Sequence, residues 1–198
     1  MTTETGFRSK LLDLFKDKGA LLEGHFVLSS GRHSDQYLQS ALLLQDPVIA
    51  EELGRALAQK FPGSIQAVIS PALGGLIIGH EVARAKGCRA IFSEKDDQGK
   101  PVLRRGFSIK PDERVLVVED VITTGLSTAE VLWLVEQSGG QIMGVGSIVN
   151  RSQTNEKLLS WKKPVHSLLT VEVKSWEASA CPLCANGIPP VKPGSRKK

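Results

Sequence analysis

Short apolar runs rich in β-branched residues alternate with helical patterns along most of this chain, and this alternation constrains the fold more than any other feature. The runs are Ala67–Ile69, Val115–Val118 and Ile142–Val149. Runs of this kind are typical of strands that are covered on both faces. Strands that alternate with helices form βαβ crossovers. The sequence therefore predicts an α/β fold with an open, mostly parallel sheet flanked by helices.

Two helices are predicted between these runs. Asp46 and Pro47 form a cap and first-turn pair for a helix that extends to about Lys60. The segment 127–138 carries apolar residues at helical spacing and ends at Gly139. Both helices are long enough to connect parallel strands.

The length of 198 residues, with 41% hydrophobic content, suits a single domain. We expect three parts within residues 1–198. Residues 1–40 form an N-terminal segment with a helix near Thr5–Lys18, and residues 41–174 form the α/β core. Residues 175–198 are rich in Pro, Gly and Cys and are expected to lie on the surface.

The charge of the chain does not favour a nucleic-acid partner. The net charge is +4, but four of the 25 basic residues lie among the last seven, KPGSRKK. The other 21 balance the 21 acidic residues. No apolar run approaches the ~20 residues of a membrane span, and the start MTTETGFRSK does not resemble a secretory signal. We expect a cytoplasmic protein with no membrane and no nucleic-acid partner.

The segment that follows Val115–Val118 carries the chemistry. It contains two adjacent acids, then a loop with hydroxyl groups and one glycine, and then a helix. Its residues are Glu119, Asp120, Val121, Ile122, Thr123, Thr124, Gly125, Leu126 and Ser127. Ligands of open α/β sheets bind outside the carboxyl ends of strands. A helix start with free N–H groups binds phosphate, and carboxylates accept hydrogen bonds from ribose hydroxyls. The segment therefore predicts a ribose 5-phosphate site, and the alternative is that the acids only cap the helix.

Other motifs are incomplete. The sequence contains no G-x-x-x-x-G-K-[ST], and the pair His80-Glu81 is followed by Arg84 where a zinc protease has its second histidine. Cys181 and Cys184 have the spacing of half a zinc site, and the other half is missing unless another chain or His166 contributes. Surface thiols are the favoured interpretation of the two cysteines.

The strand, paired acids, two apolar residues and Thr-Thr-Gly-x-Ser together resemble the binding motif for 5-phosphoribosyl-1-pyrophosphate (PRPP) of type I phosphoribosyltransferases. The resemblance implies that fold, with a small N-terminal base-binding subdomain or hood and a flexible loop. It implies that residues 119–127 bind PRPP and that Asp120 is catalytic.

Three further segments resemble the orotate phosphoribosyltransferase family. They are Phe26–Tyr37, part of the base pocket in that family, Ser70–Gly75, the loop that meets pyrophosphate, and Val149–Arg151. The resemblance implies that Arg151 and Thr123 bind orotate. An arginine just past a buried strand also suits a planar carboxylate, and a surface salt bridge is the alternative.

The polar insertion Glu94–Lys100 has two interpretations. It is either a plain hairpin tip or, by the resemblance, a mobile hood that closes over the site and reaches the neighbouring subunit of a dimer. Lys95 is then a catalytic residue that binds PRPP and stabilises the departing pyrophosphate. Three positions lack the basic residue that many better-known members of the family carry there. They are Ser29 and Gly74, where many have lysine, and Glu94, where many have arginine. Arg104 and Arg105 are the expected substitute cations.

The resemblance implies a Mg²⁺-dependent transfer of ribose 5-phosphate from PRPP to orotate, which yields orotidine 5′-monophosphate and pyrophosphate in UMP biosynthesis. The expected assembly is a homodimer with shared active sites. Mg²⁺ is expected to arrive with PRPP, without dedicated protein ligands. The alternatives are a type I enzyme for a purine base, a PRPP-sensing regulatory protein and an inactive structural subunit.

Overall fold

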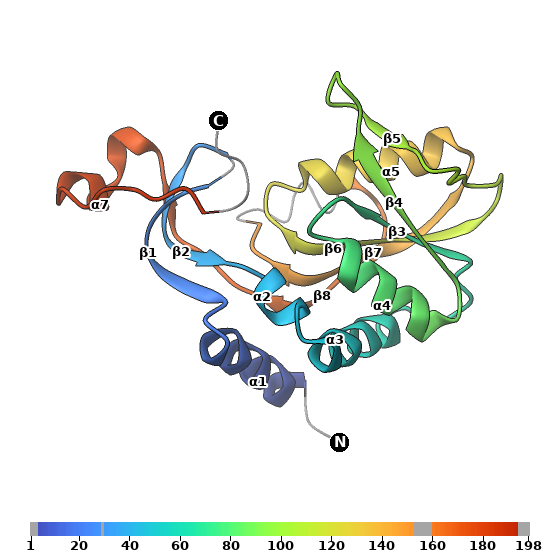
Figure 1. The fold of residues 1–198 in the computed structure, drawn as a ribbon, viewed down its shortest axis with the longest axis horizontal. Coiled ribbons are helices and arrows are strands. Elements are labelled where there is room, and N and C mark those ends of the chain that lie inside the picture. The colour runs from blue at the N-terminus through green and yellow to red at the C-terminus, as the bar shows by residue number, and fades with distance from the viewer. Residues whose placement is uncertain (1–3, 29, 153–159, 194–198) are drawn as a thin grey trace. The chain divides into compact units, whose positions relative to one another are not determined.

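The computed structural model describes residues 4–28, 30–152 and 160–193, and these divide into two compact units (Figure 1). The central unit is Leu44–Val171. The terminal unit combines the described residues up to Leu43 with those from Glu172 onward. The N-terminal and C-terminal segments that the sequence delimits near residues 40 and 175 thus belong to one unit.

The central unit contains a six-stranded sheet with the order β5-β4-β3-β6-β7-β8. All neighbouring pairs are parallel except β4 and β5, which are antiparallel. The prediction of an open, mostly parallel sheet is confirmed. The strands are β3 (Ala67–Pro71), β4 (Arg89–Lys95), β5 (Pro101–Leu103), β6 (Arg114–Ile122), β7 (Gln141–Asn150) and β8 (Val165–Thr170).

Helices cover both faces of this sheet. Figure 1 shows α5 (Leu126–Gln137) on one side and α3 (Pro47–Gln59) with α4 (Leu76–Lys86) on the other. A short helix, α2 (Ala41–Leu44), precedes them. Asp46 caps α3 as predicted, because its Oδ1 accepts hydrogen bonds from the N–H groups of Val48 (3.1 Å) and Ile49 (3.5 Å).

The core of the central unit lies between the sheet and these helices. Val115–Val118 are fully buried, and alternate residues of the run point to opposite faces of the sheet. Val115 and Val117 pack in a cluster that includes Val131 and Val135 of α5. Burial of each such side chain contributes roughly 1.5–3 kcal/mol, which is why so continuous an apolar run forms the central strand.

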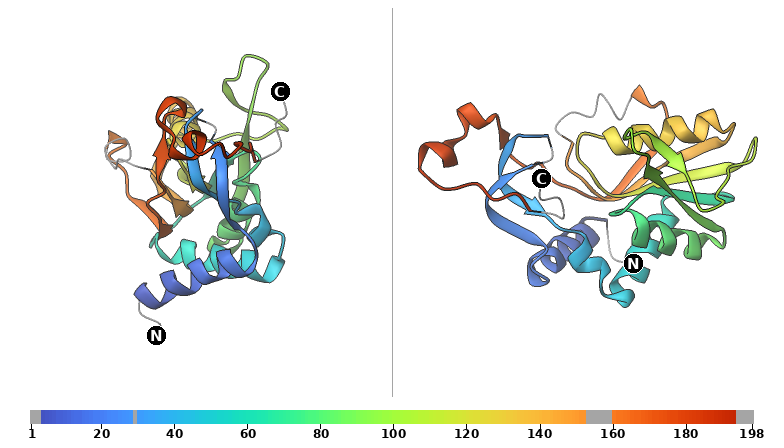
Figure 2. Two further views of the ribbon diagram at one scale, coloured as in Figure 1. Left: turned by 90° about the vertical axis from the view of Figure 1, so that its left-hand side faces the viewer. Right: turned by 45° about the horizontal axis from the view of Figure 1, so that its top comes forward.

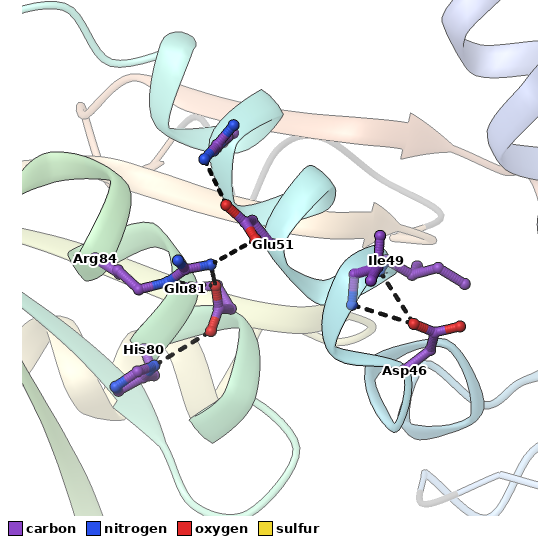
Figure 3. A network of polar contacts seen from close by, with 8 residues as sticks. Asp46, Ile49, Glu51, His80, Glu81 and Arg84 are labelled. Carbon is purple, nitrogen blue, oxygen red and sulfur yellow. Dashed lines mark hydrogen bonds and ion pairs between the residues drawn. The ribbon is translucent and has the colours of Figure 1, made fainter.

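Helices α3 and α4 touch at Gly54. A Cβ atom at this position would lie 2.5 Å from the Cβ atom of Glu81, so only glycine permits the observed approach. Beside this contact, Arg84 lies between Glu51 and Glu81 (Figure 3). Its Nε donates to Glu81 (2.9 Å), and its Nη2 lies 3.3 Å from the Glu51 carboxylate. A glycine contact flanked by ion pairs therefore fixes the spacing of the two helices.

The terminal unit contains α1 (Glu4–Asp17) and a three-stranded antiparallel sheet with the order β1-β2-β9. Strands β1 (Leu21–Val27) and β2 (His33–Leu38) form a hairpin, and β9 (Ser175–Trp176) pairs with β2. Two short helices follow, η1 (Ala178–Ala180) and α7 (Pro182–Ala185). None of the helices in the described parts of the chain is long and apolar enough to span a membrane.

The C-terminal segment packs against the β1–β2 hairpin, as Figures 1 and 2 show for the segment that carries α7. Val191 closes the contact: its carbonyl accepts from the N–H of Val27 (2.8 Å), and its own N–H donates to the carbonyl of His25 (2.7 Å). Cys181 is only 3% exposed in this arrangement. The expectation of surface thiols is therefore wrong for Cys181, because the segment returns to the hairpin and buries it.

Candidate functional site

The candidate site lies at the carboxyl ends of β3 and β6, which are neighbours in the sheet. The chain leaves β3 through α4 toward β4 on one side and leaves β6 through α5 toward β7 on the other. Connections that diverge from two adjacent strands open a crevice at their carboxyl ends, where open α/β sheets bind ligands. The two segments that the sequence singles out, Ser70–Gly75 and Glu119–Ser127, are the loops at this point.

The loop after β3 packs closely against the carboxylate of Asp120 at Gly74. A Cβ atom at Gly74 would lie 2.8 Å from the Asp120 Oδ1 atom and 2.9 Å from its Oδ2 atom. At Gly75, a Cβ atom would lie 3.1 Å from the carbonyl oxygen of Val118. A larger residue at position 74 would therefore have to displace Asp120, which gives a physical reason for the glycine at this position.

The two adjacent acids have different environments. Asp120 is half-buried, whereas Glu119 is only 7% exposed and accepts a hydrogen bond from the backbone N–H of Asp120 (3.2 Å). Burial, and then the neighbouring charge of Asp120, raise the pKa of Glu119 well above its ordinary value. Glu119 therefore keeps its proton to higher pH than an ordinary glutamate, and in that form its carboxyl group can donate a hydrogen bond.

Neither acid caps α5. The N-cap residue is Gly125, in the left-handed conformation (φ 70°, ψ 10°), and no side chain caps this helix. The alternative in which Glu119 and Asp120 serve only as a helix cap is therefore wrong. The side chains of Thr124 and Ser127 are exposed, and Thr124 Oγ1 accepts from the N–H of Leu126 (3.4 Å).

The helix start is suited to an anion. Free N–H groups of the first turn and nearby hydroxyl groups attract phosphate, and the left-handed glycine turns the chain sharply into the helix.

The side chains of the residues predicted to bind PRPP do not all face outward. Ile122 is 1% exposed and its side chain belongs to the apolar core, so the predicted contact of Ile122 with PRPP would have to come from its backbone. Val121 and Thr123 are half-buried, and Leu126 is 56% exposed.

Arg151 lies at the same edge of the sheet. Its backbone N–H donates to the carbonyl of Ile122 (2.9 Å), directly before Thr123. Arg151 is 9% exposed, so it does not lie on the open surface. The Oδ1 atom of Asn150 accepts hydrogen bonds from the N–H (3.0 Å) and the hydroxyl (2.7 Å) of Ser152. This turn shapes the chain on both sides of Arg151.

The segment Glu94–Lys100 forms the tip of the β4–β5 hairpin, which projects from the sheet (Figure 2). Asp96 closes the turn, because its Oδ1 accepts from the N–H groups of Gln98 (2.9 Å) and Lys100 (2.8 Å). Lys95 is bound by Glu130 of α5, with Nζ 2.8 Å from Oε1. The hairpin geometry is thus observed, and closure over the site stays a prediction.

Sequence reasoning did not identify Glu130 or Asn150. Glu130 lies 35 positions from Lys95, and no local pattern connects them. Asn150 had a local signal, since asparagine before a polar residue at a strand end favours such a turn.

The two arginines after β5 differ. Arg105 donates two hydrogen bonds of 2.9 Å to the carboxylate of Glu94. The hydrogen bond from Arg105 lowers the pKa of Glu94. Arg104 is exposed and forms no ion pair with a described residue. Of the two proposed substitute cations, Arg105 is therefore neutralised by Glu94.

Among the described residues, one group of metal-ligating side chains brings three or more donors together, and it lies in the terminal unit. It consists of His25, His33, Cys181 and Cys184. The sequence left the partners of the cysteines open, with His166 as one candidate. His166 instead packs edge-on against Phe61, with ring centroids 5.1 Å apart. Ser29, another residue singled out in the sequence, lies outside the described residues.

Comparisons with known proteins agree with this geometry. Residues 39–183 match the family described as "Phosphoribosyl transferase domain". The orotate phosphoribosyltransferase of Pelotomaculum thermopropionicum is 52% identical over 191 residues, which covers 96% of this chain and 98% of that protein. The enzyme of Carboxydothermus hydrogenoformans is 50% identical over 194 residues, with 96% and 100% coverage.

A solved structure supports the same assignment. The crystal structure of orotate phosphoribosyltransferase from Aeropyrum pernix is 28% identical, has a TM-score of 0.70, and covers 81% of this chain and 93% of that chain. The residues matched by the family span both loops of the candidate site. Sequence identity of about one half over almost the full length narrows the assignment from phosphoribosyltransferases in general to the orotate phosphoribosyltransferases. The chain therefore belongs to the orotate phosphoribosyltransferase family of type I phosphoribosyltransferases.

Proposed function

We propose that this chain transfers the ribose 5-phosphate group of PRPP to orotate, which yields orotidine 5′-monophosphate and pyrophosphate for UMP biosynthesis. The observation that carries the proposal is the end of β6, where Asp120 lies against the Gly74 loop and an uncapped helix start follows. A carboxylate beside an anion-binding helix start matches the hydroxyls and the phosphate of one ribose phosphate. The family assignment supports the same reaction.

Each part of the site has a role in this proposal. The loop Thr123–Ser127 binds the 5-phosphate, Asp120 and Glu119 bind the ribose hydroxyls, and the loop Ser70–Gly75 meets the pyrophosphate. The bond from the anomeric carbon to pyrophosphate breaks as the base nitrogen bonds to that carbon, through a state with oxocarbenium character. The protein supplies position and charge rather than a covalent intermediate.

Lys95 stabilises the negative charge that develops on the departing pyrophosphate. Mg²⁺ bound with PRPP would neutralise part of the same charge. The described residues of the central unit form no cluster of three or more His, Cys, Asp or Glu ligands. They therefore fit an ion held mainly by substrate oxygens and water.

Arg151 and Thr123 bind the base. Orotate carries a planar carboxylate, and a guanidinium group can donate two parallel hydrogen bonds to it. The low exposure of Arg151 strengthens such a contact, because water screens it less. Purine bases lack this carboxylate, so Arg151 is expected to select against them.

The reaction can be tested directly with purified protein, Mg²⁺ and PRPP. Orotate, adenine, hypoxanthine and uracil are offered in parallel, and nucleotide formation is followed for each. We expect product from orotate alone, and Arg151→Ala is expected to abolish it. Because Arg151 is buried, Arg151→Lys is the second variant, with at least about a tenfold higher KM for orotate, the loss expected from about 1.4 kcal/mol of binding.

The outcomes separate the alternatives. Product from a different base would retain the PRPP site and overturn the assignment of Arg151. PRPP binding without product from any base would support a PRPP-sensing protein instead. The melting temperatures of both Arg151 variants show whether a loss of activity reflects unfolding.

We also propose a homodimer in which Lys95 acts in the site of the neighbouring subunit. Lys95 pairs with Pro101 at the tip of the projecting β4–β5 hairpin, and its side chain is 46% exposed. A Lys95→Ala chain mixed with an Asp120→Ala chain should regain activity, because one of the two sites in a mixed dimer is intact. No recovery after verified subunit exchange would contradict shared sites, and each variant incubated alone is the control.

A further inference from the structure

Four potential metal ligands converge in the terminal unit. They are Nε2 of His25, Nδ1 of His33, and the Sγ atoms of Cys181 and Cys184, and all ligand atoms of the group lie within 4.8 Å of one another. His25, His33 and Cys181 are buried, at 3%, 7% and 3% exposure. Cys184 forms the open side of the cluster.

Hydrogen bonding alone does not account for this arrangement. His25 Nδ1 lies 2.6 Å from the carbonyl oxygen of Ile188, which can only accept, so Nδ1 carries the proton and Nε2 has a lone pair. Three atoms surround that one lone pair: His33 Nδ1 at 2.8 Å, Cys181 Sγ at 3.4 Å and Cys184 Sγ at 3.8 Å. This lone pair can accept a well-aligned hydrogen bond from only one of the three neighbours, whereas a cation at the centre accepts electrons from all four atoms.

The distances suit a small tetrahedral ion. Zinc bonds of about 2.0–2.1 Å to nitrogen and 2.3 Å to sulfur separate neighbouring ligands by about 3.3–3.8 Å. Three of the four sulfur–nitrogen distances within the cluster are 3.3 Å (Cys184 to His33), 3.4 Å (Cys181 to His25) and 3.8 Å (Cys184 to His25). The two histidine nitrogens, 2.8 Å apart, need to separate by only about 0.5 Å to reach this range.

The surroundings of the cluster also match a metal centre. The carbonyl of Ile188 orients His25, and a hydrogen bond to the second ring nitrogen is the usual support of a metal-binding histidine. Cys181 is the N-cap residue of α7 and Cys184 lies within this helix; the N–H of Ala185 donates to the Cys181 carbonyl (3.1 Å), and the N–H of Gly187 donates to the Cys184 carbonyl (2.9 Å). The backbone thus holds the two sulfurs on one side.

We propose that His25, His33, Cys181 and Cys184 form a structural Zn²⁺ site that joins the β1–β2 hairpin to the C-terminal segment. Two thiolates and two imidazoles select zinc over hard cations such as Mg²⁺ and Ca²⁺. Four protein ligands complete a tetrahedron and leave no position for a substrate, so the site is structural. Such a site contributes folding free energy to a small unit with a limited apolar core.

The test begins with metal analysis of the untagged full-length chain, purified under reducing conditions. We expect about one zinc ion per chain. Cys184→Ser is the first variant, because Cys184 is exposed and its replacement leaves the buried core intact. Loss of a group that only hydrogen-bonds to a metal ligand already weakens metal binding about 10–100-fold, so loss of the ligand itself should weaken zinc binding on the order of hundredfold or more. Cys88→Ser, a cysteine of the central unit, is the matched control and should retain zinc.

A second measurement does not depend on any variant. Zinc is removed from the wild-type chain with a chelator, and Co²⁺ is added as a spectroscopic probe. The absorption of a tetrahedral cobalt site with thiolate ligands is expected, together with recovery of the melting temperature when zinc is restored. Zinc content that is equal in wild type and Cys184→Ser would overturn the proposal, as would failure of the reduced wild-type chain to bind either metal. A Cys181–Cys184 disulfide in protein kept under reducing conditions would do so as well.

Discussion

The carboxylate of Asp120 lies where a side chain at Gly74 would begin, since a Cβ atom there would be 2.8 Å from the Asp120 Oδ1 atom. The loop after β3 and the end of β6 are therefore fitted to each other at the level of single atoms. Because both loops are assigned to the same substrate, a small change in one should be measurable at the other.

Gly74→Ala should impair catalysis without unfolding the protein. Gly74 does not adopt a left-handed conformation, so alanine acts through its contact with Asp120 rather than through backbone strain. We expect kcat/KM for PRPP to fall about tenfold, equivalent to about 1.4 kcal/mol, with little change in melting temperature. Steady-state kinetics and thermal unfolding check both parts.

The matched control for Gly74→Ala is the same substitution in an Asp120→Asn background. If the alanine acts by displacing Asp120, most of its effect should vanish once the carboxylate is gone. An equal loss in both backgrounds would show that Gly74 acts independently of Asp120.

Glu119→Gln should flatten the pH dependence of stability. The pKa of Glu119 is raised in the folded protein, so the folded state retains a proton that the unfolded state releases above pH ~4.5. The contribution of Glu119 to stability is therefore fully present below pH ~4.5 and falls as pH rises, by at most about 1.4 kcal/mol per pH unit, until the raised pKa is passed. Denaturant unfolding between about pH 5 and about pH 8 should show a smaller loss for Glu119→Gln than for the wild type.

Glu113 provides a comparison, because its pKa is shifted in the opposite direction to that of Glu119. Burial disfavours its charge, but hydrogen bonds from the N–H of Lys110 (2.9 Å) and from Arg89 (2.7 Å) outweigh it and lower its pKa. Its contribution is present above the ordinary pKa and is lost as pH falls, so Glu113→Gln should act on the acid side. If both variants changed the same pH range, the assignment to Glu119 would be incorrect.

Glu130→Gln should lower the KM for PRPP. Glu130 holds the ammonium group of Lys95 at 2.7–2.8 Å, and this pair competes with the proposed contact of Lys95 to pyrophosphate. Exposed ion pairs contribute up to about 1 kcal/mol, so we expect a decrease of up to about fivefold. In a Lys95→Ala background, Glu130→Gln should have no effect on KM. A decrease that persists there would exclude Lys95 as the cause.

Gly54→Ala should destabilise the central unit. Alanine is the better helix former by about 1 kcal/mol, so without a tertiary contact the change would stabilise α3. The contact with Glu81, 2.5 Å from the new Cβ atom, should reverse the sign and cost about 1–3 kcal/mol overall. Denaturant unfolding measures this change in the free energy of unfolding. The control is Glu52→Ala, at an exposed position of α3, which should change the free energy of unfolding by no more than about 0.5 kcal/mol.

The sequence predicted the parts of the fold that depend on local patterns. Val115–Val118 form a buried strand, Asp46 caps α3, and Arg151 lies at the sheet edge of the paired acids. Each rests on a run, a cap or a strand end, and these signals occupy a few consecutive residues. The loop motif was recognised for the same reason.

Features formed by distant residues were not predictable. His25 lies 156 positions from Cys181, and neither carries a local sign of the other. A histidine in a strand pattern is compatible with a buried core position or with metal binding, and only the returning C-terminal segment distinguishes the two. The inward side chain of Ile122 was missed for a related reason, since membership of a motif does not indicate which face of the strand a residue occupies.

The terminal unit is built from two segments at opposite ends of the chain, and this has a consequence for the order in which the protein folds during synthesis. The central unit is contiguous in the chain, so it can fold while translation continues. The β1–β2 hairpin leaves the ribosome early but must wait for β9, the two cysteines and Val191, the last of which is 164 residues beyond Val27. Until then the buried faces of His25 and His33 have no cover, so the hairpin, which precedes the central unit in the chain, is among the last parts of the structure to be completed.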